Sequence, residues 1–148
     1  MDETDRKIAA LLQDDCSLPQ AQIARAVGRV ASSVNERMRK LKADGVVRGY
    51  RAELDPERAG FPILAFVTVL IDDAKNAAAF PKAAVKVAEV LECHHVTGEW
   101  NFLLKVRARS TSNLEEILTG RIKKVRGVTR TNTSIVLTSH KETHALPL

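Results

Sequence analysis

Aromatic residues are scarce in this sequence of 148 residues, at 4% of the chain. Surfaces that hold single-stranded nucleic acid stack bases on aromatic side chains, so this class of binding surface is not expected. No apolar run reaches the roughly 18 residues that a membrane span needs, so no membrane partner is expected. The two cysteines, Cys16 and Cys93, stand far apart in the sequence, which favours free thiols in a reducing cytoplasm over a disulfide.

Metal-binding and catalytic patterns are also missing. The cysteines and the four histidines do not occur at the short spacings of a zinc site, so neither a metal nor another cofactor is expected. His94 and His95 are adjacent, so on a strand they face opposite sides, and we expect one to be buried or at a subunit interface and the other solvated. Residues 1–5 are acidic and lack an apolar core, so no secretory signal is expected.

The chain does have an excess of positive charge. It contains 23 Lys and Arg against 18 Asp and Glu, which gives a net charge of +5. The excess is concentrated between residues 29 and 48, where six basic residues stand against two acidic ones. Such a local excess suits contact with the phosphates of a nucleic acid, although a solvated helix face is the alternative.

Residues 23–50 carry the clearest pattern in the chain. It predicts a short helix, a turn at Gly28 and a second helix over residues 31–43. One side of the second helix is an apolar stripe of Ala31, Val34, Met38 and Leu41. An earlier helix, with Asp2 as its N-cap, precedes this pair, and Ser17 is the predicted N-cap of the middle helix.

Three helices with a polar, basic last helix are typical of a helix-turn-helix that places its second element in a major groove. A core helix pair of a bundle fits the apolar pattern equally well, and the local charge favours DNA. The candidate DNA-binding residues are Ser32, Ser33, Glu36, Arg37, Arg39 and Lys40. Serine is not selective between bases, glutamate can accept from cytosine, and the cations suit phosphates.

Strand patterns replace helical ones after residue 60. The predicted strands are 63–71, 90–97, 101–108 and 128–138, and the predicted helices are 75–87 and 113–124. The order β-α-β-β-α-β predicts an antiparallel sheet with both helices on one face, and its open face is expected to pair with a second copy. Residues 46–54 are predicted to leave the helical part as a strand. The fold class is therefore α+β, with domains at 1–50 and 61–148 and a linker at 51–60.

Motifs along nearly the whole chain resemble the Lrp/AsnC (leucine-responsive/asparagine-responsive) family of transcription regulators. The matching stretches are Asp-x-x-Asp-x-x-Ile-x-x-x-Leu at 2–12, Ile-Ala-x-x-Val-Gly at 23–28, Ser-Ser-Val-x-x-Arg-x-x-x-Leu at 32–41, Gly-Val-Val-x-Gly-Tyr at 45–50, Val-Thr-Gly-Glu-Trp-Asn-Phe-Leu-Leu-Lys at 96–105, Gly-Val at 127–128 and Thr-x-Thr-x-Ile-Val-Leu at 131–137. The resemblance implies a winged helix-turn-helix followed by a ferredoxin-like effector and oligomerisation domain. It also implies double-stranded DNA as partner, homodimers that assemble into tetramers or octamers, and a cytoplasmic, nucleoid-associated regulator rather than an enzyme.

The resemblance further implies an amino-acid effector that is held between dimers near the Gly98 turn. The candidate effector-binding residues are Gly98, Glu99, Asn101, Thr133 and Ser134. Asn101 stands where the family usually has Asp, so it offers a ligand ammonium no charge, and Ser134 stands where some members have an aromatic residue. An α-amino acid, a different small molecule and no ligand at all therefore stay open. Val30 replaces the usual serine, so the helix that begins at residue 31 is expected to lack a side-chain cap.

Two other functions compete with this interpretation. An architectural DNA-packing protein would bind DNA without sensing a ligand, and the neutral Asn101 is compatible with that. Some sirohaem decarboxylases resemble the same family fold and use histidines near the positions of His94 and His95. Against that enzyme, the chain keeps the Thr97-Gly98-Glu99 turn and the charged helix typical of regulators.

Overall fold

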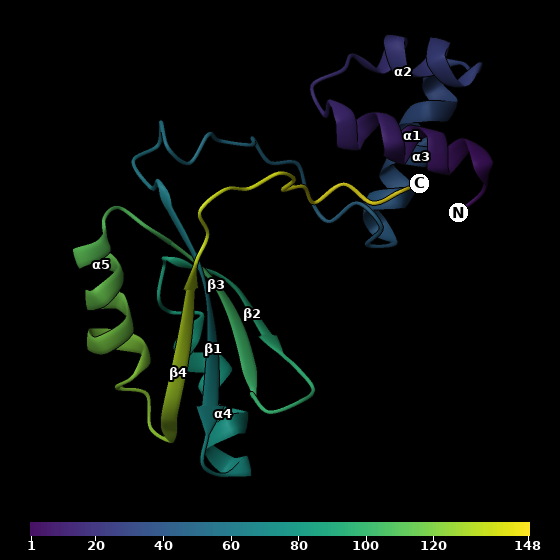
Figure 1. The fold of residues 1–148 in the computed structure, drawn as a ribbon. Coiled ribbons are helices and arrows are strands. Elements are labelled where there is room, and N and C mark those ends of the chain that lie inside the picture. Colours follow the sequence, from purple (N-terminus) through teal and green to yellow (C-terminus); the bar gives the residue numbers. More distant parts are fainter. The chain divides into compact units, whose positions relative to one another are not determined.

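A computed structural model describes all 148 residues, and the chain divides into two compact units (Figure 1). The first unit comprises Met1–Glu53 with Lys141–Leu148, and the second comprises Leu54–His140. No helix in either unit has the length and apolar character needed to cross a membrane.

The first unit is built from three helices. They are α1 (Glu3–Asp14), α2 (Gln20–Val27) and α3 (Ala31–Ala43), so α3 has the predicted bounds. The predicted turn is present, because Gly28 ends α2 at a φ of +65° that suits glycine. The prediction that Asp2 caps α1 is confirmed, because its carboxylate accepts a hydrogen bond of 2.8 Å from the Asp5 backbone N–H. The core of this unit contains Ile8, Leu12, Ile23, Ala24, Val34 and Leu41.

Of the two other predictions about helix caps, the one for Ser17 is wrong and the one for Val30 is confirmed. The Ser17 prediction is wrong, because Pro19 is the N-cap residue of α2 and the Ser17 hydroxyl donates to Asp15 at 2.6 Å instead. A proline has no N–H, so it fits where the helix would leave that donor unpaired. Val30 is the N-cap residue of α3 and makes no side-chain capping bond, as expected from the missing serine.

The predicted strand over residues 46–54 is absent, so that prediction is wrong. The four-stranded sheet of the chain contains no residue of this stretch. A strand needs a neighbour to pair its N–H and C=O groups, and none lies beside it. The Val47 backbone N–H donates instead to the Leu41 carbonyl at 3.0 Å, which satisfies one of the last carbonyls of α3.

The last eight residues belong to the first unit, not to the 61–148 domain that the sequence predicts. The side chain of Gln13 in α1 forms two hydrogen bonds with the backbone of Leu146. Its Nε2 donates to the Leu146 carbonyl at 3.1 Å, and its Oε1 accepts from the Leu146 N–H at 2.6 Å. These bonds join residues 133 positions apart, which a sequence pattern does not reveal.

The second unit confirms the β-α-β-β-α-β order and the α+β fold class. Its elements are β1 (Ile63–Ile71), α4 (Ala74–Ala84), β2 (Val90–His95), β3 (Phe102–Ala108), α5 (Thr111–Glu115), the π-helix η1 (Glu116–Ile122) and β4 (Val128–Ile135). All strand pairs are antiparallel, and the order across the sheet is β2-β3-β1-β4.

The second predicted helix of this unit differs in both its bounds and its geometry. It begins at Thr111 and ends at Ile122, and its last seven residues are π-helical. The Thr119 hydroxyl donates to the Glu115 carbonyl at 2.7 Å, and the Lys123 N–H reaches back to Leu118 at 2.8 Å. A side-chain hydroxyl that occupies a carbonyl of the preceding turn is a known cause of such irregularity.

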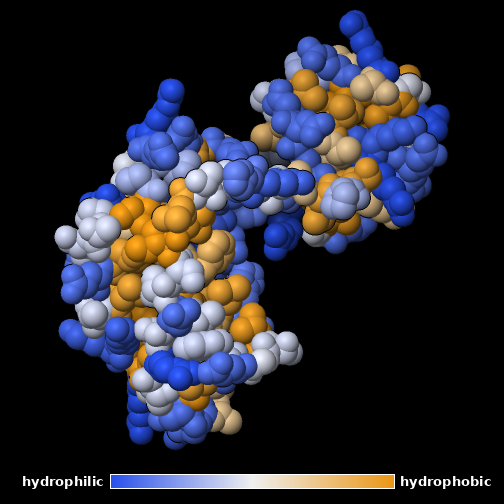
Figure 2. All heavy atoms as spheres, in the orientation of Figure 1, coloured by the Kyte–Doolittle hydropathy of each residue, from blue (hydrophilic) through white to orange (hydrophobic).

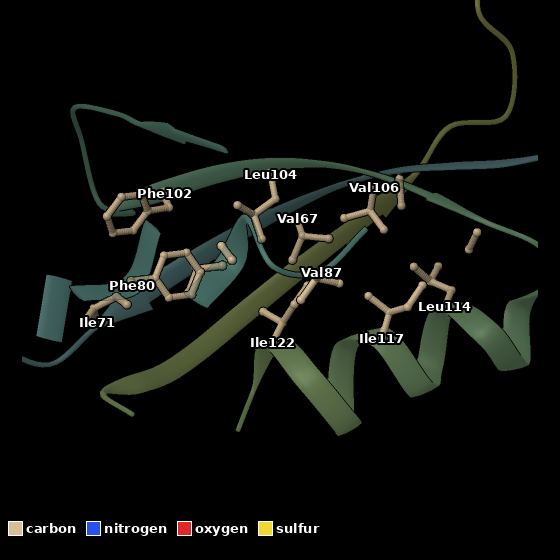
Figure 3. Packing of buried hydrophobic residues seen from close by; sticks show 14 residues of the cluster. Val67, Ile71, Phe80, Val87, Phe102, Leu104, Val106, Leu114, Ile117 and Ile122 are labelled. Atoms are coloured by element: carbon tan, nitrogen blue, oxygen red, sulfur yellow. The ribbon is translucent and has the colours of Figure 1, made fainter. Parts of the chain in front are cut away.

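The core of the second unit lies between one face of the sheet and its helices (Figure 3). The labelled side chains from strands and helices point toward one another there, with Phe80 and Phe102 at a centroid distance of 4.8 Å. On β1, Ala65, Val67 and Val69 are completely buried in this core. The residues between them occupy the opposite face of the sheet, where Phe66 is 37% exposed. Figure 2 shows hydrophobic residues gathered on the visible side of this unit.

Candidate functional site

The exposed side of α3 is polar and basic. Ser32, Glu36, Arg39 and Lys40 are exposed, Ser33 and Arg37 are half-buried, and Val34 and Leu41 on the other side are buried in the core. Lys42 and Arg29 add two further exposed cations at its ends. The structure therefore brings most of the predicted DNA-binding residues onto one accessible helix surface.

Arg37 differs from the other candidates, because its side chain is paired with residues at the start of α1. Its guanidinium forms ion pairs with Asp2 at 2.6 Å and with Asp5 at 2.7 Å. Both carboxyls have a lowered pKa, chiefly because each accepts a backbone N–H of the other and also because Arg37 stabilises the ionised form. Arg37 therefore holds α3 against α1, so it is not among the residues free to contact a phosphate.

Asn35 is an exposed residue of α3 that the sequence prediction did not include. Its amide accepts a hydrogen bond of 3.4 Å from the side chain of Gln20 in α2. Helical spacing could have identified it, because Asn35 lies about 40° around the helix axis from Arg39.

In the second unit, the turn between β2 and β3 carries a small polar cluster. Glu99 forms an ion pair with Arg130 of β4, and the Arg130 guanidinium lies 4.7 Å from the centroid of the Trp100 ring. The two charged side chains are more than half exposed, so they are accessible to a ligand. The family motif predicted Glu99 as a site residue but not Arg130, which lies 31 residues further along the chain.

Asn101, in the same turn, uses its side chain within the fold. Its Oδ1 accepts a hydrogen bond of 2.6 Å from the backbone N–H of Ile71, at the end of β1. The backbone N–H of Asn101 donates a hydrogen bond of 3.0 Å to the backbone carbonyl of Val69. The amide therefore connects the turn to the central strand, and its Nδ2 and the second lone pair of its Oδ1 are what it can still offer to a ligand.

Thr133 and Ser134 do not join this cluster. Successive strand residues point to opposite faces, so Thr133 shares a face with its partner Val67 and Ser134 shares the other face with Phe66. Ser134 is four residues from Arg130 along β4, which is roughly 13 Å in a strand. Within one chain, the five predicted effector residues therefore do not surround one small ligand.

The two adjacent histidines do not form a joint site. Both are exposed in the single chain, so neither is buried within it, and the expectation that one lies at a subunit interface stays a prediction. His94 contacts Glu92 at 3.1 Å, whereas His95 stacks on Phe102 at a centroid distance of 5.0 Å. The contact with His94, followed by that with Lys105, lowers the pKa of the Glu92 carboxyl. The histidines are thus on opposite sides of an edge strand, which does not support the enzyme alternative.

Comparison with known families also gives two domains, although the second match extends past His140 into the residues that belong to the first unit. Residues 1–48 match a winged helix-turn-helix DNA-binding domain, and residues 64–146 match the Lrp/AsnC ligand binding domain. These two matches define the class as a transcription regulator that couples a DNA-binding domain to a ligand-binding domain.

Individual relatives span nearly the full length of the chain. The HTH-type transcriptional regulator FL11 of Pyrococcus horikoshii is 36% identical, over 100% of this chain and 97% of the relative. The leucine-responsive regulatory protein of Klebsiella pneumoniae is 30% identical, over 99% and 90%. The chain belongs to the Lrp/AsnC family of transcription regulators, and its relatives are named as regulators rather than enzymes.

Solved structures give the same result for the fold. A transcriptional regulator from Neisseria meningitidis, described as a complex with L-methionine, has a TM-score of 0.94 and 32% identity, with 99% of this chain and 96% of that chain covered. A feast or famine regulatory protein from M. tuberculosis, also complexed with L-methionine, has a TM-score of 0.91 and 31% identity, with 98% and 97% covered.

Proposed function

We propose that α3 of this regulator binds the major groove of double-stranded DNA and that a small molecule, an amino acid or a related metabolite, binds at the turn between β2 and β3. The exposed basic surface of α3 is the observation that carries the proposal. The residues proposed to face the DNA are Ser32, Ser33, Glu36, Arg39 and Lys40.

The division of labour on α3 follows from residue chemistry. Ser32 and Glu36 lie on the exposed side of its N-terminal half, which is the part of a recognition helix that contacts base edges. Arg39 and Lys40 follow one turn later and suit phosphates, which position the protein without reading sequence. Arg37 does not face the DNA in this arrangement. Its ion pairs with Asp2 and Asp5 connect α3 to the start of α1 and so stabilise the position of α3.

The ligand proposal rests on the opposite charges at the turn. Glu99 can accept an ammonium group and Arg130 can donate two hydrogen bonds to a carboxylate, so together they match a zwitterion. Two related structures are described as L-methionine complexes, which makes L-methionine the first probe. Thr133 and Ser134 contribute only if a second copy brings them to this turn.

We also propose that the chain acts as a dimer or a larger assembly. The sheet has helices on one face, and Phe66 on its other face is 37% exposed. A second copy would cover this face, as isologous pairing of two identical surfaces requires. A ligand at the turn would then act by favouring one packing of the copies over another.

A DNA-packing protein without effector is the second candidate, and Asn101 is the observation that favours it. The Asn101 Oδ1 is already bonded to Ile71, and the side chain carries no charge for a ligand ammonium. This candidate predicts DNA binding with weak sequence preference and no response to any metabolite.

One experiment separates these functions. The full chain is screened by thermal shift against amino acids, with light scattering for assembly size and fluorescence anisotropy for duplex binding. The proposed function predicts that at least one amino acid raises the melting temperature and changes both assembly and duplex affinity. Duplex binding with no metabolite effect supports the packing protein, and no duplex binding contradicts both.

A further inference from the structure

The exposed face of α3 carries an uncharged amide on the side that faces α2. Asn35 is exposed, and helical geometry places it about 40° from Arg39 and about 60° from Ser32 around the axis. It is the fifth of the 13 residues of α3, counting from Ala31, so it lies in the half of a recognition helix that meets base edges. An amide in this place can donate and accept hydrogen bonds at the same time.

A second amide orients Asn35 from the neighbouring helix. Gln20, the first residue of α2, donates from its Nε2 to the Oδ1 of Asn35 at 3.4 Å. This contact directs the oxygen of Asn35 toward α2 and so distinguishes the two ends of its amide. The oxygen keeps a second lone pair, and both hydrogens of Nδ2 remain to be donated.

We propose that Asn35 recognises an adenine in the major groove and that Gln20 is its positioning residue. The inference rests on the proposed function, in which α3 lies in that groove. Adenine presents an N6 donor beside the N7 acceptor, and an asparagine amide matches both. Guanine presents two acceptors, so the remaining lone pair of the Asn35 oxygen would face an acceptor instead of a donor. The preference therefore follows from the amide itself and needs no charge.

The test is selection of binding sites from a random duplex library with the full chain. Asn35→Ala is expected to weaken the preference for A·T at one position of each half-site by about 5- to 100-fold. Gln20→Ala is expected to weaken the same preference by less. Gln22→Ala removes another exposed glutamine of α2 and serves as the matched control, with the selected site unchanged.

Two further measurements identify the hydrogen bonds. Replacing the adenine by 7-deazaadenine removes the N7 acceptor, so the affinity of the unmodified chain falls while that of Asn35→Ala does not. Asn35→Asp keeps the shape but offers only acceptors, so the preference is expected to shift toward cytosine, which presents an N4 donor. Far-UV circular dichroism checks that each variant folds.

The outcomes distinguish this inference from the function on which it rests. If Asn35→Ala selects the same site with the same preference for A·T at every position, the inference is overturned and the proposed function stands. If the unmodified chain enriches no duplex, both are overturned.

Discussion

The backbone N–H of Ile71 donates a hydrogen bond of 2.6 Å to the side-chain oxygen of Asn101. This bond connects the end of the central strand β1 to the turn that precedes β3. The Ile71 residue is 7% exposed, so water does not readily replace the amide as a partner. Asn101, which the family pattern suggests as a ligand contact, therefore also stabilises the fold by pairing the Ile71 N–H.

Asn101→Ala is expected to lower the free energy of unfolding of the second unit by about 1–3 kcal/mol, because it leaves a buried N–H without its acceptor. Asn101→Asp keeps an acceptor at this place, so its loss is expected to be smaller, and its added charge should raise affinity for a free amino acid. Trp100 is the single tryptophan of the chain, so its fluorescence during denaturation reports on this unit. Equal losses in the two variants would contradict the assigned bond.

Local sequence patterns were enough to predict the bounds of the helix and the strand whose apolar residues follow the clearest pattern. The apolar stripe of α3 gave its bounds, and the β-branched run at 63–71 gave those of β1. Both patterns depend on residues within one element. The failed strand at 46–54 had suitable residues too, but a strand exists only beside a partner, and the local pattern contains no information on whether one is present.

The candidate sites were predictable only in part, for the same reason. Helical spacing placed Ser32, Glu36 and Arg39 on the exposed side of α3 correctly. It could not show that Arg37 is paired, because Asp2 and Asp5 lie 35 and 32 residues away. It also missed Arg130, because only the folded sheet brings β4 to the turn that contains Glu99.

Gly127→Ala is expected to destabilise the second unit by about 2–5 kcal/mol, from left-handed strain and a steric clash together. Gly127 has a φ of +88°, and an added Cβ would lie 2.4 Å from the Asn76 Cβ. Gly49→Ala is the matched control, since a Cβ there meets nothing within 4 Å, and its effect is expected to stay within about 0.5 kcal/mol. Denaturant titration of both variants measures the difference, and similar midpoints would argue against the close approach of Asn76.

The carboxyls of Asp2 and Asp5 predict a pH dependence of the first unit. Their pKa values are lowered in the folded chain, first because each accepts a backbone N–H of the other and then because of Arg37. The folded state therefore binds these protons less readily than the unfolded state, and the stabilisation is present above the unfolded pKa and is lost as the pH falls below about 4.

Arg37→Gln should therefore destabilise the chain at neutral pH, and its difference from the unmodified chain should shrink as the pH falls. Helical circular dichroism during denaturation at several pH values follows this unit, which is built from helices. Arg39→Gln is an exposed control on the same helix, for which a small and constant difference is expected. If the difference in stability between Arg37→Gln and the unmodified chain is also constant with pH, Arg37 does not contribute to the lowered pKa values of Asp2 and Asp5.

Arg130→Ala is expected to reduce affinity for L-methionine by about 10- to 100-fold, because a hydrogen-bonded charge pair contributes about 1.5–3 kcal/mol. Arg130→Lys keeps the charge but loses the fork that binds both carboxylate oxygens, so an intermediate affinity is expected. Isothermal titration calorimetry measures all three proteins, with the exposed Arg126→Ala as control. Undiminished binding in Arg130→Ala would remove Arg130 from the ligand site.

Replacing Arg39 and Lys40 together by Ala is expected to weaken binding to every duplex and to flatten its salt dependence. Each cation that neutralises a phosphate releases a counterion, so the slope of log affinity against log salt should become shallower by about 1.8.

Arg37→Ala is the control that distinguishes the loss of a positive charge from the loss of a phosphate contact. It removes the same kind of cation from the same helix, but Asp2 and Asp5 already pair with it, so its slope should stay unchanged while stability falls. Anisotropy titrations across a salt series provide the slopes. If the double variant keeps the full slope, the exposed face of α3 does not lie against the phosphates.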